Sequence, residues 1–81
     1  MRLDQYLSDL AIIKKRTLAK EMADNGLIKI NGQRVKPAHQ VKPGDIISVG
    51  GGHPITVEIK EVPTGNVRKD EREKFFKELA K

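Results

Sequence analysis

Three consecutive cations precede a predicted helix start. Lys14, Lys15 and Arg16 are followed by Thr17, whose hydroxyl can cap a helix by accepting a bond from a free backbone N–H. The first N–H groups of a helix lack partners within it, and the helix dipole adds positive charge there. These groups form an anion site, and phosphate is the expected anion. A solvated charge run before an ordinary helix is the alternative, and these residues alone do not decide between the two.

The excess positive charge belongs to the first half of the chain. Residues 1–42 contain nine Lys and Arg against four Asp and Glu, whereas residues 43–81 contain seven of each. A one-sided basic surplus is the electrostatic footprint of a nucleic-acid partner. A membrane partner is not expected, because no basic amphipathic helix with bulky apolar anchors accompanies the charge.

Helical spacing predicts two helices in this half. The first, over residues 1–10, has an apolar stripe and places Asp4 on its polar side. Tyr6 belongs to the stripe, and we expect it in the core rather than stacked on a base. The second helix begins at Thr17 and is closed by Gly26, where a left-handed residue commonly ends a helix. Such a short helix must pack against the first helix and a sheet to be stable.

Alternating apolar residues predict a small antiparallel sheet of about four strands. The expected strands are residues 27–30, 33–36, 46–49 and 55–59. Asn31-Gly32 is a strong hairpin signal because both positions need positive φ, and the Lys42–Asp45 segment suits a type II turn with glycine at its third position. With two helices packed on this sheet, the predicted fold class is α+β.

The predicted hairpin carries three further cations. Lys29, Arg34 and Lys36 are expected to project from one region while their apolar neighbours face inward. Like charges on neighbouring strands repel, and a bound polyanion would relieve that repulsion. The alternative is that these long side chains simply extend into water.

The tail is predicted to be a linker followed by a helix over residues 67–81, so the expected division is a domain at 1–62 and an appended segment at 63–81. Asp70 is the expected helix cap, with Glu73 three residues later. Phe75, Phe76 and Leu79 supply an apolar patch. We expect this patch to dock on the domain, and docking on a partner is the alternative.

Several classes of function are disfavoured by what the sequence lacks. It has no cysteine and only two histidines, so neither a disulfide framework nor a protein-held zinc site is expected. The loop at residues 50–54 lacks the Lys-Ser/Thr ending of a phosphate-cradling loop. No catalytic combination of side chains is suggested by spacing, so neither enzymatic activity nor a cofactor is expected. The first residues do not form a signal peptide, which favours the cytoplasm.

The order of these features resembles the S4 RNA-binding domain family. The resemblance covers about residues 1–60 and is carried by RLDQYL and by KKRTLAKEMADNGLIKINGQRVKPAHQVKPGDIISV. It implies the αL fold, in which two helices precede a small antiparallel sheet. It also implies that Arg2 and Arg16 contact RNA and that Lys14, Lys15 and Lys20 belong to the basic helix region. The sequence departs from the family pattern at Leu10-Ala11, where relatives often have Ser or Thr followed by Arg.

Within the family, the chain resembles the small stand-alone bacterial proteins that act in ribosome-associated quality control. That resemblance implies association with rRNA of the 50S subunit and with peptidyl-tRNA on obstructed subunits, while RqcH adds alanines to the nascent chain. We expect a monomer off the ribosome. The resemblance, the basic helix start and the hairpin cations together give the predicted RNA-binding residues, which are Arg2, Lys14, Lys15, Arg16, Thr17, Lys20, Lys29, Arg34 and Lys36.

Three other functions stay open. The first is a heat-shock-type or tRNA- or rRNA-binding S4 protein without a tailing role. The second is an accessory or fragment of an S4-containing RNA-modifying enzyme. The third is a protein-interaction adaptor that uses the apolar tail.

Overall fold

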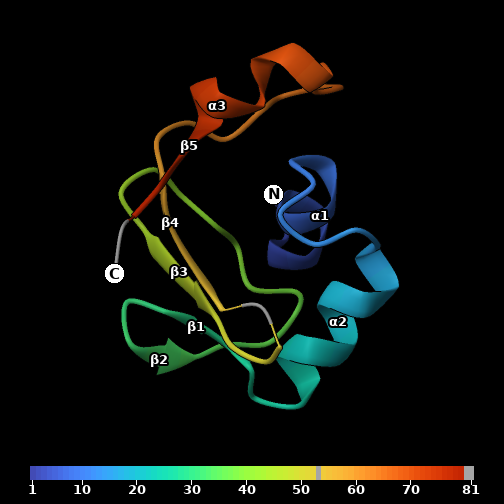
Figure 1. Cartoon of the computed structure of the whole chain (residues 1–81), viewed down its shortest axis with the longest axis vertical. Coiled ribbons are helices and arrows are strands. Elements are labelled where there is room, and N and C mark those ends of the chain that lie inside the picture. Colours follow the sequence, from blue (N-terminus) through green and yellow to red (C-terminus); the bar gives the residue numbers. More distant parts are fainter. Residues whose placement is uncertain (53, 80–81) are drawn as a thin grey trace.

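The computed structural model describes residues 1–52 and 54–79, and it has two helices on one side of a sheet (Figure 1). The helical elements are α1 (Leu3–Asp9), α2 (Arg16–Asp24), a 3-10 turn η1 (Lys69–Glu71) and α3 (Arg72–Phe75). The strands are β1 (Ile28–Ile30), β2 (Gln33–Arg34), β3 (Ile46–Val49), β4 (Ile55–Ile59) and β5 (Phe76–Glu78). The predicted α+β class is confirmed. None of the described helices is long and apolar enough to cross a membrane.

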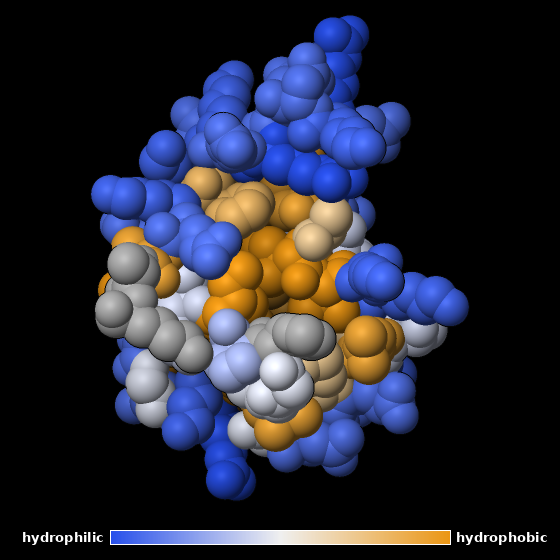
Figure 2. Space-filling view, viewed as in Figure 1, coloured by the Kyte–Doolittle hydropathy of each residue, from blue (hydrophilic) through white to orange (hydrophobic). Residues whose placement is uncertain are grey.

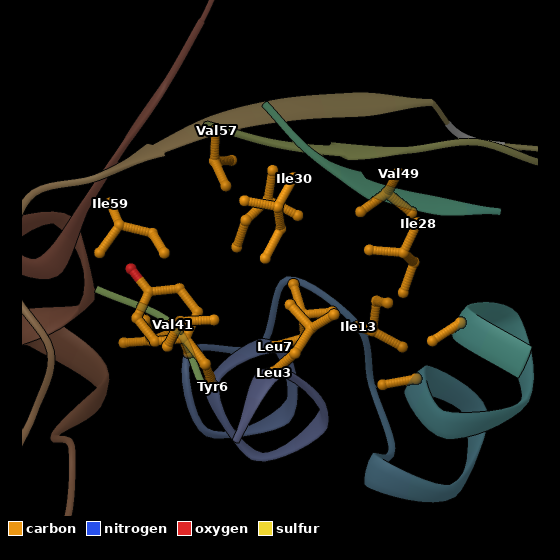
Figure 3. Packing of buried hydrophobic residues seen from close by; sticks show 14 residues of the cluster. Leu3, Tyr6, Leu7, Ile13, Ile28, Ile30, Val41, Val49, Val57 and Ile59 are labelled. Atoms are coloured by element: carbon orange, nitrogen blue, oxygen red, sulfur yellow. The ribbon is translucent and has the colours of Figure 1, made fainter. Parts of the chain in front are cut away.

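The five strands form one antiparallel sheet in the order β2-β1-β3-β4-β5. The inward face of the sheet follows the alternation in the sequence, because successive side chains of a strand point to opposite faces. Figure 3 shows Ile28, Ile30 and Val57 projecting from the strands toward the side chains of the helices. Tyr6 lies among them and is fully buried, which confirms its predicted place in the core.

The two predicted turns are confirmed. Asn31 and Gly32 both have positive φ, 52° and 85°, as a two-residue type I′ hairpin requires. In the second turn the Asp45 N–H donates to the Lys42 carbonyl at 3.2 Å, and Gly44 has a φ of 94°. The two turns are joined, because the Asn31 side-chain amide donates to the Asp45 carboxylate at 3.3 Å. This contact fixes the hairpin against the start of β3.

Both N-terminal helices end in the same hydrogen-bond pattern. The Ile12 N–H donates to the Leu7 carbonyl at the end of α1, and the Leu27 N–H donates to the Met22 carbonyl at the end of α2, each at 2.9 Å. A residue with positive φ precedes each donor, as in the Schellman motif. Gly26 fills that position in α2, as predicted, with a φ of 75°. In α1 the position is filled by Ala11, at 56°.

The predicted helix over residues 67–81 is wrong. The segment forms η1 and the four-residue α3 and then changes to an extended strand, β5, which pairs with β4. Without β5 the edge of β4 would present unpaired backbone groups, and pairing with that edge overrides the weak helical preference of the tail. The last two residues of the predicted helix, and His53 of the predicted loop, lie outside the described residues.

The tail nevertheless docks on the domain, as expected. The Tyr6 hydroxyl donates to the Phe75 carbonyl at 3.1 Å, and both phenylalanines pack against the core while remaining half-buried. Burial raises the pKa of the Tyr6 phenol, so it stays a donor. The predicted Asp70 cap is wrong, because neither η1 nor α3 has a side-chain cap.

Candidate nucleic-acid interface

Two arginines from different helices meet at one buried carboxylate. The Arg2 Nε and Nη2 atoms donate to Asp4 Oδ1 and Oδ2, each at 3.2 Å. The Arg16 Nε lies 3.4 Å from Asp4 Oδ2. The Asp4 side chain is 3% exposed, whereas those of Arg2 and Arg16 are 42% and 49% exposed. The site therefore presents two half-exposed guanidinium groups that are both paired with one buried carboxylate.

The start of α1 is held by the segment that follows the hairpin. The Leu3 N–H donates to the His39 carbonyl at 2.8 Å, and the Asp4 N–H donates to the Pro37 carbonyl at 3.1 Å. Arg2 forms an isolated antiparallel bridge with Gln40. The backbone on which Arg2 and Asp4 sit is thus fixed by contacts more than 30 residues away in sequence, before any side chain is considered.

Thr17 does not cap α2, so that prediction is wrong. The helix begins one residue earlier, at Arg16, and the N-cap is Lys15, which has an extended backbone and makes no side-chain capping bond. The first helical bond runs from the Ala19 N–H to the Lys15 carbonyl. The N–H groups before Ala19 have no partner within the helix. The donors expected of an anion site are therefore present at this end, although Thr17 is an exposed residue inside the first turn.

The basic residues around α2 occupy different sides of it. Arg16 and Lys20 lie one helical turn apart, and both are exposed. Lys14 instead lines a hollow with Leu18 and Met22, facing the loop between β3 and β4. Lys15 is exposed at the N-cap. The structure places Arg2 and Arg16 at one carboxylate, whereas Lys14 lines a hollow on another part of the surface.

The hairpin cations form a second group. Lys29 and Arg34 are direct partners across β1 and β2, and the burial of Ile28 and Ile30 turns Lys29 toward the outer face of the sheet. Arg34 also reaches the end of α2, where a Cβ at Gly26 would lie 3.3 Å from its Cζ atom. With Lys36 it lines a shallow hollow beside the C-terminal half of α2.

Asp4 is the residue that sequence reasoning missed. Helical spacing assigned it to the polar, solvated side of α1, yet it is 2% exposed. The available signal was the Arg2-Leu3-Asp4 spacing, since charged residues are rarely buried unless they are paired. The second partner, Arg16, gives no local signal because it comes from the next helix.

An apolar hollow lies on another part of the surface. Figure 2 shows hydrophobic side chains gathered in a depression bordered by hydrophilic ones. One hollow between α2 and the β3–β4 loop is lined by Ile12, Leu18, Met22, Val49 and Ile55, among others.

Among the described residues, no group of three or more His, Cys, Asp and Glu could hold a metal ion.

Known proteins resemble this chain in sequence and in structure. Residues 1–47 match the S4 domain. A protein of Bacillus subtilis named RQC P-site tRNA stabilizing factor is 49% identical over 63 residues, which are 76% of this chain and 73% of that protein. A protein of the same name from Listeria innocua is 38% identical over 76 residues, covering 94% of this chain and 83% of its own length. The trimeric structure of Vibrio cholerae Heat Shock Protein 15 superposes with a TM-score of 0.87 at 31% identity, covering 99% of this chain and 82% of that one.

Proposed function

The chain belongs to the S4 domain family, and we propose that it is a non-enzymatic RNA-binding factor that holds tRNA on the large ribosomal subunit during ribosome-associated quality control. The relatives that share most of its length are named for stabilising P-site tRNA. The site of this function would be the cytoplasm, where bacterial ribosomes work.

The observation that carries the proposal is the pair of half-exposed arginines held at Asp4. Guanidinium groups match phosphate oxygens in a two-pronged geometry that lysine cannot reproduce. Folded RNA is recognised mainly through its shape and backbone. The burial of Tyr6 removes the aromatic platform that single-strand stacking at this end would need. The surface is therefore suited to the phosphates of structured RNA.

The finer assignment follows the same relatives. The RNA would be rRNA of the 50S subunit together with peptidyl-tRNA, held while RqcH extends the nascent chain with alanine. The residues proposed to contact RNA directly are Arg2 and Arg16. Lys14, Lys15, Thr17, Lys20, Lys29, Arg34 and Lys36 are proposed as surrounding contacts. The protein would be a monomer off the ribosome.

A second candidate is a heat-shock-type S4 protein that binds large subunits without a tailing role. The observation that favours it is the fold likeness to Heat Shock Protein 15 over almost the whole chain. The two candidates differ in one prediction. Only the first predicts that the addition of alanine tails to stalled nascent chains depends on this protein.

Sucrose-gradient sedimentation of the tagged protein in cell lysate tests the proposal. We expect it to co-migrate with 50S subunits, and tRNA probed in the same fractions to be enriched with it. Migration as free protein, or with RNA other than the large subunit, would contradict the ribosomal role. Loss of alanine tails on deletion of the gene would then separate the first candidate from the second.

A further inference from the structure

We propose that Asp4 is the positioning residue of the RNA-binding surface. Its buried carboxylate holds the guanidinium groups of Arg2 and Arg16 in one arrangement before RNA arrives. The inference rests on the proposed function, because it assigns Asp4 a role in the binding of RNA that Asp4 itself does not touch.

The carboxylate is occupied on both oxygens. Oδ1 accepts bonds from the Gln5 backbone N–H at 2.8 Å and from Arg2 Nε at 3.2 Å. Oδ2 accepts a bond from Arg2 Nη2 at 3.2 Å and faces Arg16 Nε at 3.4 Å. The backbone of Asp4 is fixed in turn by its N–H bond to the Pro37 carbonyl. The acid is therefore a rigid element of the fold rather than a mobile surface charge.

The arginines retain donors for a ligand. Arg16 faces Asp4 through Nε, so neither of its terminal amino groups is used in that contact. Arg2 uses Nε and Nη2, which leaves Nη1 outside the contact. Both side chains stay about half exposed. Each guanidinium can thus bind a phosphate oxygen while it remains attached to the carboxylate.

A buried acid in a basic surface is unfavourable for RNA binding if only net charge matters. It subtracts one positive charge beside a polyanion. It is favourable if geometry matters, because long arginine side chains lose rotamer freedom when they are immobilised at an interface. Contact with Asp4 means that this rotamer freedom is already lost when the protein folds and not when RNA binds. The carboxylate also lies between the two arginines and reduces the repulsion between their like charges. If net charge dominates, removal of the carboxylate should strengthen RNA binding. If geometry dominates, the same removal should weaken RNA binding.

The substitution Asp4→Asn tests this difference in sign. Asparagine keeps the size and one carbonyl oxygen for the Gln5 N–H, and it raises the net charge by one. If Asp4 positions the arginines, the Kd for purified 50S subunits at fixed salt rises about tenfold. The matched control is Asp9→Asn, which makes the same charge change later on α1 at a half-exposed position, and its Kd is expected to stay the same or fall. Unchanged or tighter binding of Asp4→Asn would overturn the inference.

A double-mutant cycle separates positioning from a general effect on the fold. In a chain that already carries Arg2→Ala and Arg16→Ala, Asp4→Asn should weaken binding no further, because Asp4 acts through those side chains. A further loss of similar size would show that Asp4 acts through stability, and would overturn the inference. If instead Arg16→Ala alone leaves the Kd unchanged, the proposed RNA-binding surface itself is wrong, and the inference falls with it.

A measurement on the unsubstituted protein keeps the test independent of folding. NMR order parameters of the arginine Nε–H groups report side-chain motion on the picosecond to nanosecond timescale. In the protein without RNA we expect Arg2 and Arg16 to be more ordered than Arg68, which is exposed in the other half of the chain. Equal disorder of all three would contradict positioning by Asp4.

Discussion

Two groups of cations on this molecule are built differently. Arg2 and Arg16 share the buried Asp4 carboxylate. Lys29 and Arg34 lie opposite each other across the hairpin, and within the described residues no acidic side chain forms an ion pair with either. The first group is held at a carboxylate, whereas the second contributes positive charge without an acidic side chain to orient it. A shared positive sign therefore does not imply a shared role, and the two groups should respond differently to substitution.

The largest effect is expected at the held pair. Arg16→Ala removes one guanidinium and leaves Arg2 as the one arginine paired with Asp4 among the described residues. Because a hydrogen bond to a charged group contributes about 1.5–3 kcal/mol, we expect the affinity for 50S subunits to fall about ten- to a hundredfold. Titration of purified subunits, read out by co-sedimentation, measures the change.

Arg68→Ala is the matched control for that substitution, since it removes the same side chain from an exposed position in the neutral half of the chain. It should change the affinity by no more than about twofold, as expected for an uninvolved charge screened by salt. Equal losses for the two variants would remove the distinction between held and free cations.

A smaller but more specific effect is expected for Arg16→Lys. Lysine keeps the charge, but its single ammonium group cannot face Asp4 and also present a planar fork to phosphate. We expect about a five- to tenfold loss of affinity, which is smaller than the loss caused by the alanine substitution. Arg34→Lys provides the comparison in the hairpin group and should bind nearly normally. An unchanged affinity of Arg16→Lys for 50S subunits would show that positive charge alone is sufficient at this position.

The smallest effect is expected at Lys29. Lys29→Ala should lower affinity by no more than about threefold and reduce the slope of log K against log salt by at most about one, as for a single phosphate contact. It also removes the like-charge pair with Arg34, so thermal stability should rise slightly, by about 0.2–1 kcal/mol. Thermal unfolding and a salt titration measure both changes. A loss as large as that of Arg16→Ala would place Lys29 among the specific contacts.

The parts of the fold that could be predicted are those with local causes. Gly26, the Asn31-Gly32 turn and the Lys42–Asp45 turn each follow from the backbone conformation that a few adjacent residues need. The family resemblance singled out Arg2 and Arg16, each as a residue predicted to contact RNA. Local spacing alone contained no reason to join them.

The parts that could not be predicted depend on contacts between distant segments. The tail has apolar residues that suit either a short helix or a strand, and the choice is made by the edge of β4, where Phe76 pairs with Ile59. The buried Asp4 forms an ion pair with Arg16 from the next helix. The left-handed Ala11 gave no signal, because alanine is not the residue expected at such a helix end.

The bond between Tyr6 and Phe75 has a consequence for how the protein is made. Its partners are 69 positions apart, so the Tyr6 hydroxyl cannot form this bond until Phe75 has been synthesised. Strand β5, which completes the sheet, comes later still. The N-terminal helices can form local bonds while translation continues, but β4 gains its partner β5 only after residues 76–78 have been made. The five-stranded sheet would thus be completed only after residues 76–78 have been synthesised.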